Sequence, residues 1–471
     1  MNNGAVNNGE KKSGFYLLSD NMDAFSARVA LANNAKHSLD IQYYMMHNDA
    51  SGRYLAYVLL QAADRGVKVR ILVDDINLAG RDSRLKMLAQ HDDIEIRIFN
   101  PLANRDWLRN LELIINLDRA GRRMHNKLFI ADQRYAIIGG RNIGDEYFDA
   151  RKSLNFVDLD LLITGPILGE LRISFDEYWN SAWATPVEQL SRIKVVKSHL
   201  SHIRARLRDY WRRFRNTGYF RQSESSALSR RIADNDIDFI WAEACLLYDK
   251  PDKLTTHDSD NMVHFGPRVM PMFDAAKREL LIASPYFIPG DAGCMWMIDK
   301  QNSGVELKVL TNSLAATDVP VVHAGYSQYR ERLLGNGISL FELKPDAITR
   351  KLHSRLLMPY RSHASLHAKY IVIDRRQVLI GSANIDPRSS NLNTEIAIAI
   401  DSEELAEQVS ALFEQTSEPG KSYQLELIDN KLVWHTLKQG NRLQYRHDPD
   451  TSLLKRLFVY LLGLLPIESL L

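Results

Sequence analysis

The stretch "MHNKLFIADQRYAIIGGRN", residues 124–142, carries polar residues at fixed intervals along an apolar segment. A second stretch 242 residues later, "LHAKYIVIDRRQVLIGSAN" (366–384), has the same residue types in the same places. Both fit the pattern H-x-K-x4-D-x6-G-x2-N, which average residue usage would produce in roughly one chain in 10⁴. Two copies therefore exclude chance. The shared residues are His125, Lys127, Asp132 and Asn142 in the first copy and His367, Lys369, Asp374 and Asn384 in the second.

The repetition extends beyond these two stretches. "AKHSLDIQYY" (35–44) resembles "AKRELLIASPYF" (276–287), and "GVKVRIL" (66–72) resembles "GVELKVL" (304–310). Matching elements in matching order at a nearly constant offset indicate gene duplication. The alternation of helical and strand patterns predicts an α/β protein with two similar lobes, each a mixed or largely parallel β-sheet flanked by helices.

The spacing inside each copy favours one chemistry. Residues i and i+2 of a strand point to the same face, about 6.6 Å apart, so each histidine projects together with its lysine. Lysine charge and asparagine amides suit the non-bridging oxygens of a phosphate. Two imidazoles can divide the work between a nucleophile and a general acid. We therefore expect one active site, shared by the two lobes and acting on a phosphodiester.

Three further residues are candidates for this site. A carboxylate on the far ring nitrogen would fix the tautomer and orientation of a catalytic histidine. Glu395 and Asp158 follow the two motifs and could do this, although each could also be an ordinary surface or strand-end acid. Ser382 stands where the first copy has Gly140, so the two halves are not equivalent. We interpret Ser382, with Asn142 and Asn384, as a substrate-binding residue.

Length and composition limit the class of protein. A chain of 471 residues with 45% hydrophobic and 25% charged residues is a globular protein of two or three domains. The net charge of +2 means that attraction to anionic partners must come from local patches. Two distant cysteines favour a reducing compartment. The polar start "MNNGAVNNGEKKSG" predicts no secretory signal, and no run reaches the ~18 apolar residues of a spanning helix.

The pattern divides the chain into four parts. Residues 1–190 and 237–420 form the lobes, 191–236 a basic amphipathic segment, and 421–471 a hairpin with an apolar tail. The basic segment could lie on an anionic membrane or on nucleic acid, or it could pack on its own lobe. The hairpin should turn at Asp429–Asn430, and the final twenty residues either insert sideways into a membrane or dock on the core. Apolar segments at 100–117 and 355–360 could form a rim dipping into lipid headgroups.

The double motif resembles the phospholipase D superfamily over nearly the whole chain. The phrases "GGRNIGDEYF", "TNSLAATDVPVVHAGY" and "DPRSSNLNTE" resemble the bacterial cardiolipin synthases of the C type. The resemblance implies a phosphohistidine intermediate without metal or other cofactor. It assigns the nucleophile to His125 and the acid, then base, to His367. Lys127, Lys369, Asn142 and Asn384 would hold the phosphate, while the motif residues Asp132 and Asp374 mainly support the fold around the site.

This resemblance implies phosphatidyl transfer from phosphatidylglycerol or phosphatidylethanolamine to a glycerol hydroxyl of phosphatidylglycerol. The expected partners are these phospholipids and an anionic membrane surface, with the protein peripheral on the cytoplasmic side of the bacterial inner membrane. A phospholipase D-type phosphodiesterase or nuclease is the first alternative, and a non-catalytic membrane scaffold the second. The apolar tail and the lack of a stacking aromatic array argue against nucleic acid as a partner. Oligomeric state stays open.

Overall fold

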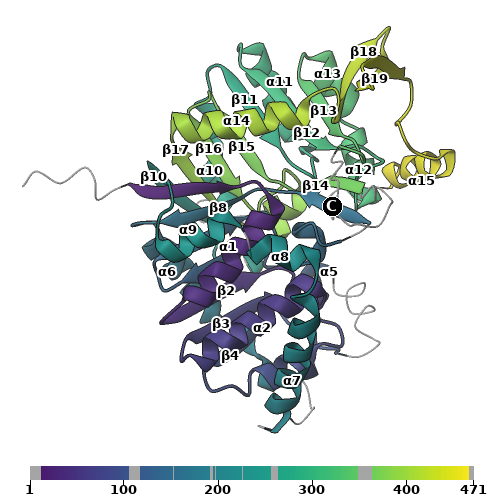
Figure 1. Cartoon of the computed structure of the whole chain (residues 1–471). Coiled ribbons are helices and arrows are strands. Elements are labelled where there is room, and N and C mark those ends of the chain that lie inside the picture. The colour runs from purple at the N-terminus through teal and green to yellow at the C-terminus, as the bar shows by residue number, and fades with distance from the viewer. Residues whose placement is uncertain are drawn as a thin grey trace, which may run out of the picture.

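The computed structural model describes residues 12–105, 117–151, 153–190, 195–196, 198–224, 226–255, 264–347 and 363–465. Two α/β lobes lie one above the other, the first purple to teal and the second green to yellow (Figure 1). The predicted duplication and fold class are therefore confirmed. The proposed headgroup rim, at 100–117 and 355–360, lies largely outside the described residues.

The sheet of the first lobe follows the order β9-β4-β3-β2-β5-β6-β8-β1. Its centre is parallel, from β2 to β4, and the other pairings are antiparallel. In these central strands the apolar residues alternate with polar or charged ones, so one face of each strand is mainly Leu, Ile and Val. The strands are β1 (Ser13–Leu18), β2 (Ser38–Tyr43), β3 (Lys68–Asp74), β4 (Ile94–Phe99), β5 (Leu128–Ala131), β6 (Tyr135–Gly139), β8 (Asp160–Thr164) and β9 (Ala184–Pro186).

The second lobe repeats this order as β18-β13-β12-β11-β15-β16-β17-β10. The predicted hairpin follows as β18 and β19, and its turn residues Asp429 and Asn430 have φ of 51° and 57°. Because β18 pairs with β13, the hairpin extends the second sheet rather than standing apart in a tail. The strands are β10 (Ile240–Tyr248), β11 (Glu279–Ala283), β12 (Glu306–Asn312), β13 (Ser339–Leu343), β15 (Tyr370–Ile373), β16 (Gln377–Gly381), β17 (Ile396–Asp401), β18 (Ser422–Ile428), β19 (Lys431–Lys438) and β20 (Asn441–Tyr445).

Two strand pairings join the lobes. β1 pairs antiparallel with β10, so the two sheets are continuous. β7 (Leu154–Val157) pairs in parallel with β14 (His363–Leu366). Asp158 follows β7 directly and His367 follows β14 directly, so this small sheet brings residues of different lobes to one place.

The helices cover the sheets and share a core between the lobes. One apolar cluster contains Leu171 and Phe175 of α6 together with Val409 and Phe413 of α14. The α-helices of the described residues are α1 (Asn21–Asn34), α2 (Ala50–Asp64), α3 (Asp82–Leu88), α5 (Leu117–Ala120), α6 (Leu168–Trp179), α7 (Ser198–Phe214), α8 (Gly218–Glu224), α9 (Ala227–Asp234), α10 (Phe265–Asp274), α11 (Gly290–Asn302), α12 (Pro320–Ser327), α13 (Arg330–Gly335), α14 (Glu403–Ser417) and α15 (Leu453–Gly463).

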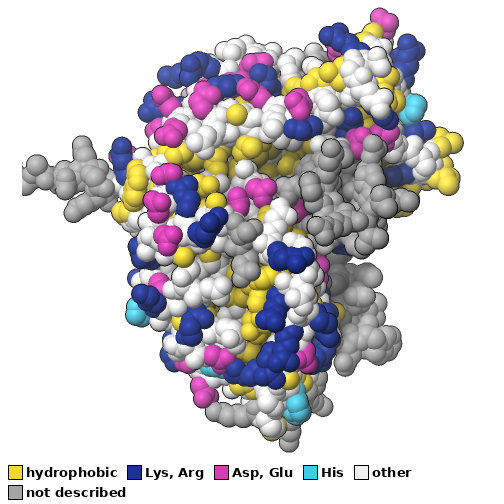
Figure 2. Space-filling view, in the orientation of Figure 1, with side chains coloured by type: hydrophobic (Ala, Val, Ile, Leu, Met, Phe, Trp, Pro, Cys, Tyr) yellow, Lys and Arg dark blue, Asp and Glu magenta, His cyan; other side chains and the backbone are white. Residues whose placement is uncertain are grey.

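The basic segment packs on the first lobe. Ile203 and Leu207 of α7 are buried, and Trp211 stacks on Tyr54 of α2 with ring centroids 4.9 Å apart. The apolar stripe of the helix is therefore used inside the protein. Its arginine side chains face outward, as the dark blue atoms over α7 show (Figure 2).

The C-terminal helix α15 docks by one side only. Val459 is buried beside Leu314 and Ala324, whereas Leu454 and Phe458 are 77% and 56% exposed. Figure 2 shows the resulting yellow surface at the right edge. Within the described residues, no helix is both long and apolar enough to cross a bilayer.

Candidate active site

His125 lies at the junction of the lobes. Its backbone N–H donates to the carbonyl of Thr394 (2.9 Å), which brings the start of the first motif against the second lobe. The Nδ1 atom of the ring lies 2.9 Å from Oε2 and 3.0 Å from Oε1 of Glu395. Both side chains are buried. The ring is therefore oriented by a carboxylate of the other lobe.

His367 shows the reciprocal arrangement. Its backbone N–H donates to the carbonyl of Val157 (2.8 Å), and its Nδ1 lies 2.6 Å from Oδ2 of Asp158. Each histidine thus depends on a carboxylate from the opposite half. With Nδ1 engaged in both rings, Nε2 is the nitrogen left for chemistry.

Asp158 and Glu395 occupy equivalent positions in the duplicated fold. The Gly140 N–H donates to the carbonyl of Leu159, the residue after Asp158. In the second lobe the Ser382 N–H donates to Ile396, the residue after Glu395. The duplication therefore supplies both carboxylates, although they stand at different distances from their motifs in sequence.

The Gly140–Ser382 difference has a steric cause. A Cβ on Gly140 would lie 2.1 Å from Oδ1 of Asp158, so the first lobe has no room for a side chain. Ser382 donates from its hydroxyl to Oε2 of Glu395 (2.5 Å) and accepts from the N–H of Ile396 (3.0 Å). The hydroxyl that we interpreted as binding substrate thus holds Glu395 in this structure.

The two lysines are buried beside the histidines. Lys127 donates to the carbonyl of His125, and the ammonium of Lys369 lies 2.9 Å from Nδ1 of His367. Burial lowers the pKa of Lys369 to about 8 and the pKa of Lys127 well below its usual range. The carboxylates of Asp158 and Glu395 raise the pKa of both lysines but do not offset the effect of burial. A negatively charged ligand would stabilise the charged form of both lysines, so the place favours an anion.

Both imidazoles are neutral at pH 7. Burial, assisted by Lys127 and Lys369, lowers the pKa of His125 to about 4, although Glu395 opposes the change. Burial and the same lysines lower the pKa of His367 to about 3. Since each histidine is affected by the lysine of the other lobe, the two motifs share one electrostatic environment.

The two asparagines differ in what they can still bind. Asn142 accepts from the Met45 N–H (3.1 Å) and donates to the Tyr147 hydroxyl (2.9 Å), so its amide is held by the protein. The Oδ1 atom of Asn384 is buried without a hydrogen-bond partner among the described residues. Asn384 is thus the asparagine with an acceptor available to a ligand.

The motif aspartates lie at the far end of the β5 and β15 strands. Asp132, with φ of 53°, accepts from the backbone N–H groups of residues 36, 37 and 38. Asp374, with φ of 54°, accepts in the same way from residues 277, 278 and 279. Both carboxylates fasten the helix-to-strand turn of their lobe. The structure therefore places them as supports of the fold rather than among the reacting groups.

Sequence reasoning missed several residues that line this centre. Tyr44 packs edge-on against His125 (4.9 Å between centroids), and Tyr147 and Phe156 pack on His367 (5.1 and 4.9 Å). Ser389 donates to Oε1 of Glu395 (2.8 Å). The phrases "GGRNIGDEYF" and "DPRSSNLNTE", which contain Tyr147 and Ser389, were the available signal.

Away from the two motifs, one cluster within the described part of the chain has the spacing of metal ligands, namely His47, Asp49 and Glu146. Its groups are already engaged. His47 Nδ1 lies 3.0 Å from Glu146, and Asp49 accepts from the N–H groups of Gly52 and Asp145 (3.0 and 2.7 Å). It is separate from the two motifs and supplies nothing to them.

Two buried histidines, whose Nε2 atoms have no hydrogen-bond partner among the described residues, and two buried lysines define a phosphodiester-processing centre of the phospholipase D type. Comparisons with known proteins agree. A family model described as "Cardiolipin synthase, PLD-like domain" matches residues 29–179 and 269–417. Cardiolipin synthase C of Escherichia coli (strain K12) is 40% identical over 464 residues, 97% of this chain and 96% of that protein.

More distant relatives share the fold. Cardiolipin synthase A of Pseudomonas entomophila is 25% identical over 399 residues, 84% of this chain and 67% of that protein. The crystal structure of phosphatidylserine synthase of Haemophilus influenzae Rd KW20 matches with a TM-score of 0.62 at 14% identity, covering 97% of this chain and 95% of that one. The chain belongs to the PLD-like cardiolipin synthase family of the phospholipase D superfamily, and its enzyme class is phosphatidyltransferase.

Proposed function

We propose that the protein makes cardiolipin by transferring a phosphatidyl group through a histidine. The donor is phosphatidylglycerol or phosphatidylethanolamine, and the acceptor is a glycerol hydroxyl of phosphatidylglycerol. The observation that carries this proposal is the exchange of carboxylates between the lobes, which leaves two Nε2 atoms and two lysines for one phosphate. The 40% identity to cardiolipin synthase C over 97% of the chain supports the lipid substrate.

His125 is the nucleophile. The hydrogen-bond partner of its Nδ1 is the carboxylate of Glu395, which can only accept. The proton therefore stays on Nδ1, and Nε2 presents a lone pair. Nε2 attacks phosphorus while Lys127 and Lys369 stabilise the charge on the non-bridging oxygens. The bond from phosphorus to the leaving alkoxide then breaks.

His367 moves the proton. Its Nδ1 has both an acceptor, Asp158, and a donor, Lys369, within hydrogen-bond distance, so the ring can carry its protons in more than one way. A bound phosphodiester anion offsets the lysine charges that lower the pKa of His367 and thereby favours protonation. His367 donates this proton to the leaving alkoxide. In the second half it removes the proton of the acceptor hydroxyl as the P–N bond breaks.

Transfer to an alcohol requires that water be kept out. Water is at ~55 M in bulk, so a dry site and a pre-positioned acceptor are needed. The buried histidines and the aromatic residues Tyr44, Tyr147 and Phe156 supply such surroundings. The exposed apolar side of α15 would hold the protein on the anionic cytoplasmic surface of a bacterial inner membrane.

Product analysis tests the proposal. Purified protein given phosphatidylglycerol vesicles should release glycerol and accumulate cardiolipin. Vesicles containing phosphatidylethanolamine together with labelled phosphatidylglycerol identify the donor. Phosphatidic acid as the main product from the earliest time points would make the enzyme a hydrolase, and cleavage of DNA without lipid turnover would make it a nuclease.

A further inference from the structure

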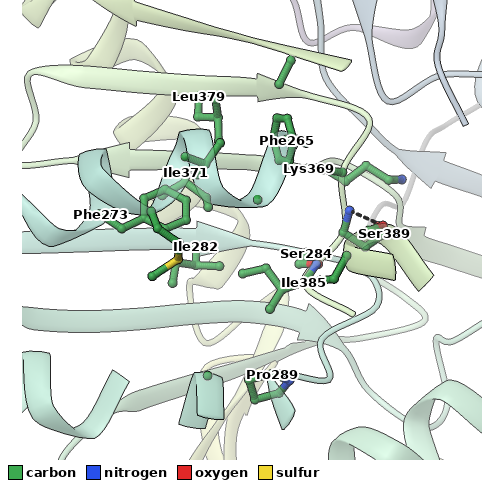
Figure 3. A pocket seen from close by; sticks show the side chains of 18 of the residues that line it. Phe265, Phe273, Ile282, Ser284, Pro289, Lys369, Ile371, Leu379, Ile385 and Ser389 are labelled. Carbon is green, nitrogen blue, oxygen red and sulfur yellow. Dashed lines mark hydrogen bonds between the residues drawn. The ribbon is translucent and has the colours of Figure 1, made fainter. Parts of the chain in front are cut away.

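The second lobe contains an apolar cavity of about 370 Å³ beneath helices α10 and α11. The floor is formed by β11, β15 and β16, and the walls are mainly aromatic and aliphatic. Figure 3 shows Phe273, Ile282, Ile371 and Leu379 around it. The volume lies within the range of small-molecule sites, about 300–1,000 Å³.

The cavity reaches the catalytic centre. Lys369, Asn384 and Ser389 belong to its lining, as do the apolar residues farther inside. In Figure 3, Lys369 and Ser389 lie at one end and Phe273 at the other. A molecule whose phosphate binds Lys369 can therefore extend an apolar part into this space.

The duplication shows that this cavity is a specific feature of the second lobe. The backbone N–H groups of Ser38 and Glu279 donate to the equivalent carboxylates of Asp132 and Asp374. The sequence offset between the two lobes is therefore 241 residues in this region. Gly139 pairs with Asp160, and Gly381 pairs with Ala397. The offset is therefore 242 residues between β6 and β16 and 237 residues between β8 and β17. The equivalent pairs are Phe25 and Gly266, Arg28 and Val269, Tyr43 and Ser284, Arg141 and Ala383, and Asp160 and Ala397.

In the first lobe these positions fill the space. Arg28 donates to the hydroxyl of Tyr43 (2.9 Å) and to Oδ2 of Asp160 (2.9 Å), and Arg141 lies 3.3 Å from the same carboxylate. All are buried. In the second lobe, each of the five positions has a smaller residue without charge, and all five smaller residues line the cavity. The second lobe is hollow where the first is solid.

We propose that this cavity binds one acyl chain of the phosphatidyl donor while Lys369 binds its phosphate. The proposal rests on the proposed function, since it takes the substrate to be a phospholipid. A cationic entrance followed by an apolar interior matches a phospholipid from phosphate to chain. The site would select donors by chain length, because each methylene that it buries strengthens binding about fourfold.

Filling the cavity tests this directly. A Cβ on Gly266 meets no atom within 4 Å, so Gly266→Phe directs a ring into open space and restores the residue type of the first lobe. Replacing a helix glycine does not weaken α10. In mixed micelles of fixed composition, we expect the variant to raise KM for dioleoyl-phosphatidylglycerol at least tenfold. Turnover of dihexanoyl-phosphatidylglycerol and of bis(p-nitrophenyl) phosphate should change less than twofold.

Gly169→Phe on α6 is the matched control, since Gly169 also has no atom within 4 Å and is exposed. An unchanged KM for the long-chain lipid in folded Gly266→Phe would overturn the proposal. So would equal loss on both lipids. Wild-type protein that hydrolyses the reporter but transfers neither lipid would instead refute the proposed function.

A binding measurement covers the case in which Gly266→Phe does not fold. Trp296 lines the cavity. Phosphatidylglycerol with brominated acyl chains should quench part of the tryptophan fluorescence of His125→Ala protein, which binds lipid without turnover. That part should disappear in His125→Ala/Trp296→Phe. Equal quenching of both proteins would show that the brominated chains reach only tryptophans outside the cavity, and it would contradict the proposal.

Discussion

Nδ1 of His125 lies 2.9 Å from Oε2 of Glu395, a residue 270 positions away in the other lobe. With the reciprocal pair of His367 and Asp158, this contact makes each half of the site incomplete alone. Two sheets joined through β1 and β10 hold the exchange in place.

Glu395→Gln should lower kcat by about 10² or more, because an amide can present its N–H₂ to Nδ1 and stabilise the wrong tautomer of His125. The Glu395 carboxylate raises the pKa of His125, so the acid limb of the rate profile should also move to lower pH. Steady-state kinetics from about pH 2.5 to 9 check both effects. Glu404→Gln on the exposed side of α14 is the control, and wild-type kcat in Glu395→Gln would contradict the role.

Gly140 and Ser382, which hold the same position in the two motifs, should not be interchangeable. Gly140→Ser places Cβ 2.1 Å from Asp158 Oδ1 and should abolish turnover while lowering stability by about 1–3 kcal/mol. Ser382→Ala only removes the hydroxyl that holds Glu395 and should reduce kcat about tenfold with the fold intact. Kinetics and urea unfolding distinguish the two. Ser410→Ala, another buried serine, serves as the reference, and normal activity of Gly140→Ser would refute the steric account.

The motif aspartate Asp132 should matter for stability more than for turnover. Asp132→Asn keeps a residue that tolerates positive φ but loses the charge that accepts three N–H groups, and should cost about 1–2 kcal/mol. Although partial burial opposes it, these donors lower the pKa of Asp132. Its contribution is therefore present at neutral pH and lost as pH falls through that lowered pKa. Unfolding of Asp132→Asn and wild type should thus converge at low pH.

Asp429→Asn, at φ of 51° on the hairpin tip, is the control for this substitution. A fall in kcat with unchanged unfolding would show that Asp132 acts in catalysis after all.

The pH dependence of kcat/KM should reflect the empty site. Lys369 has a pKa of about 8, lowered by burial, so binding of the phosphodiester should weaken above that pH as the ammonium is lost. His125, with a pKa of about 4, should lose its nucleophilic form only in strong acid. Substrate anion stabilises the charged lysine, so kcat should fall at higher pH than kcat/KM. Coincident alkaline limbs would contradict this assignment.

Membrane attachment should depend on α15. Leu454→Ser/Phe458→Ser removes two exposed apolar side chains, each contributing about 25 cal/mol per Å² buried in lipid, and should reduce flotation with anionic vesicles about tenfold or more. Bis(p-nitrophenyl) phosphate turnover should not change. Trp241→Ser is the control, because it removes an apolar side chain that is 55% exposed but lies outside α15. It should float like the wild-type protein. If the double variant floats like wild type, α15 is not the anchor.

The sequence predicted what repeats locally, and it missed what depends on the assembly of the lobes. Spacing of His125 and Lys127 on one strand identified the chemistry, because period-two geometry needs no tertiary information. The sequence offered Glu395 as a carboxylate for a catalytic histidine, but it did not show that Glu395 serves His125 of the other lobe, because this contact depends on the β1–β10 and β7–β14 pairings. The hydrogen bond from Ser382 to Glu395 could not be predicted for the same reason, since a hydroxyl in a motif looks free until its carboxylate partner is placed. The cavity in the second lobe became visible only by comparison with Arg28 and Tyr43 in space.

Trapping of the covalent intermediate tests the central claim most directly. His367→Ala lacks the acid, so a labelled phosphatidyl ester of p-nitrophenol, whose leaving group needs no proton, should load the enzyme and remain attached. Mass spectrometry of the digested protein should find the phosphatidyl group on His125 at close to one per chain, and none in His125→Ala. Label on His367 of the wild-type protein would reverse the two roles, and a protein that turns over lipid without any labelled histidine would contradict the account.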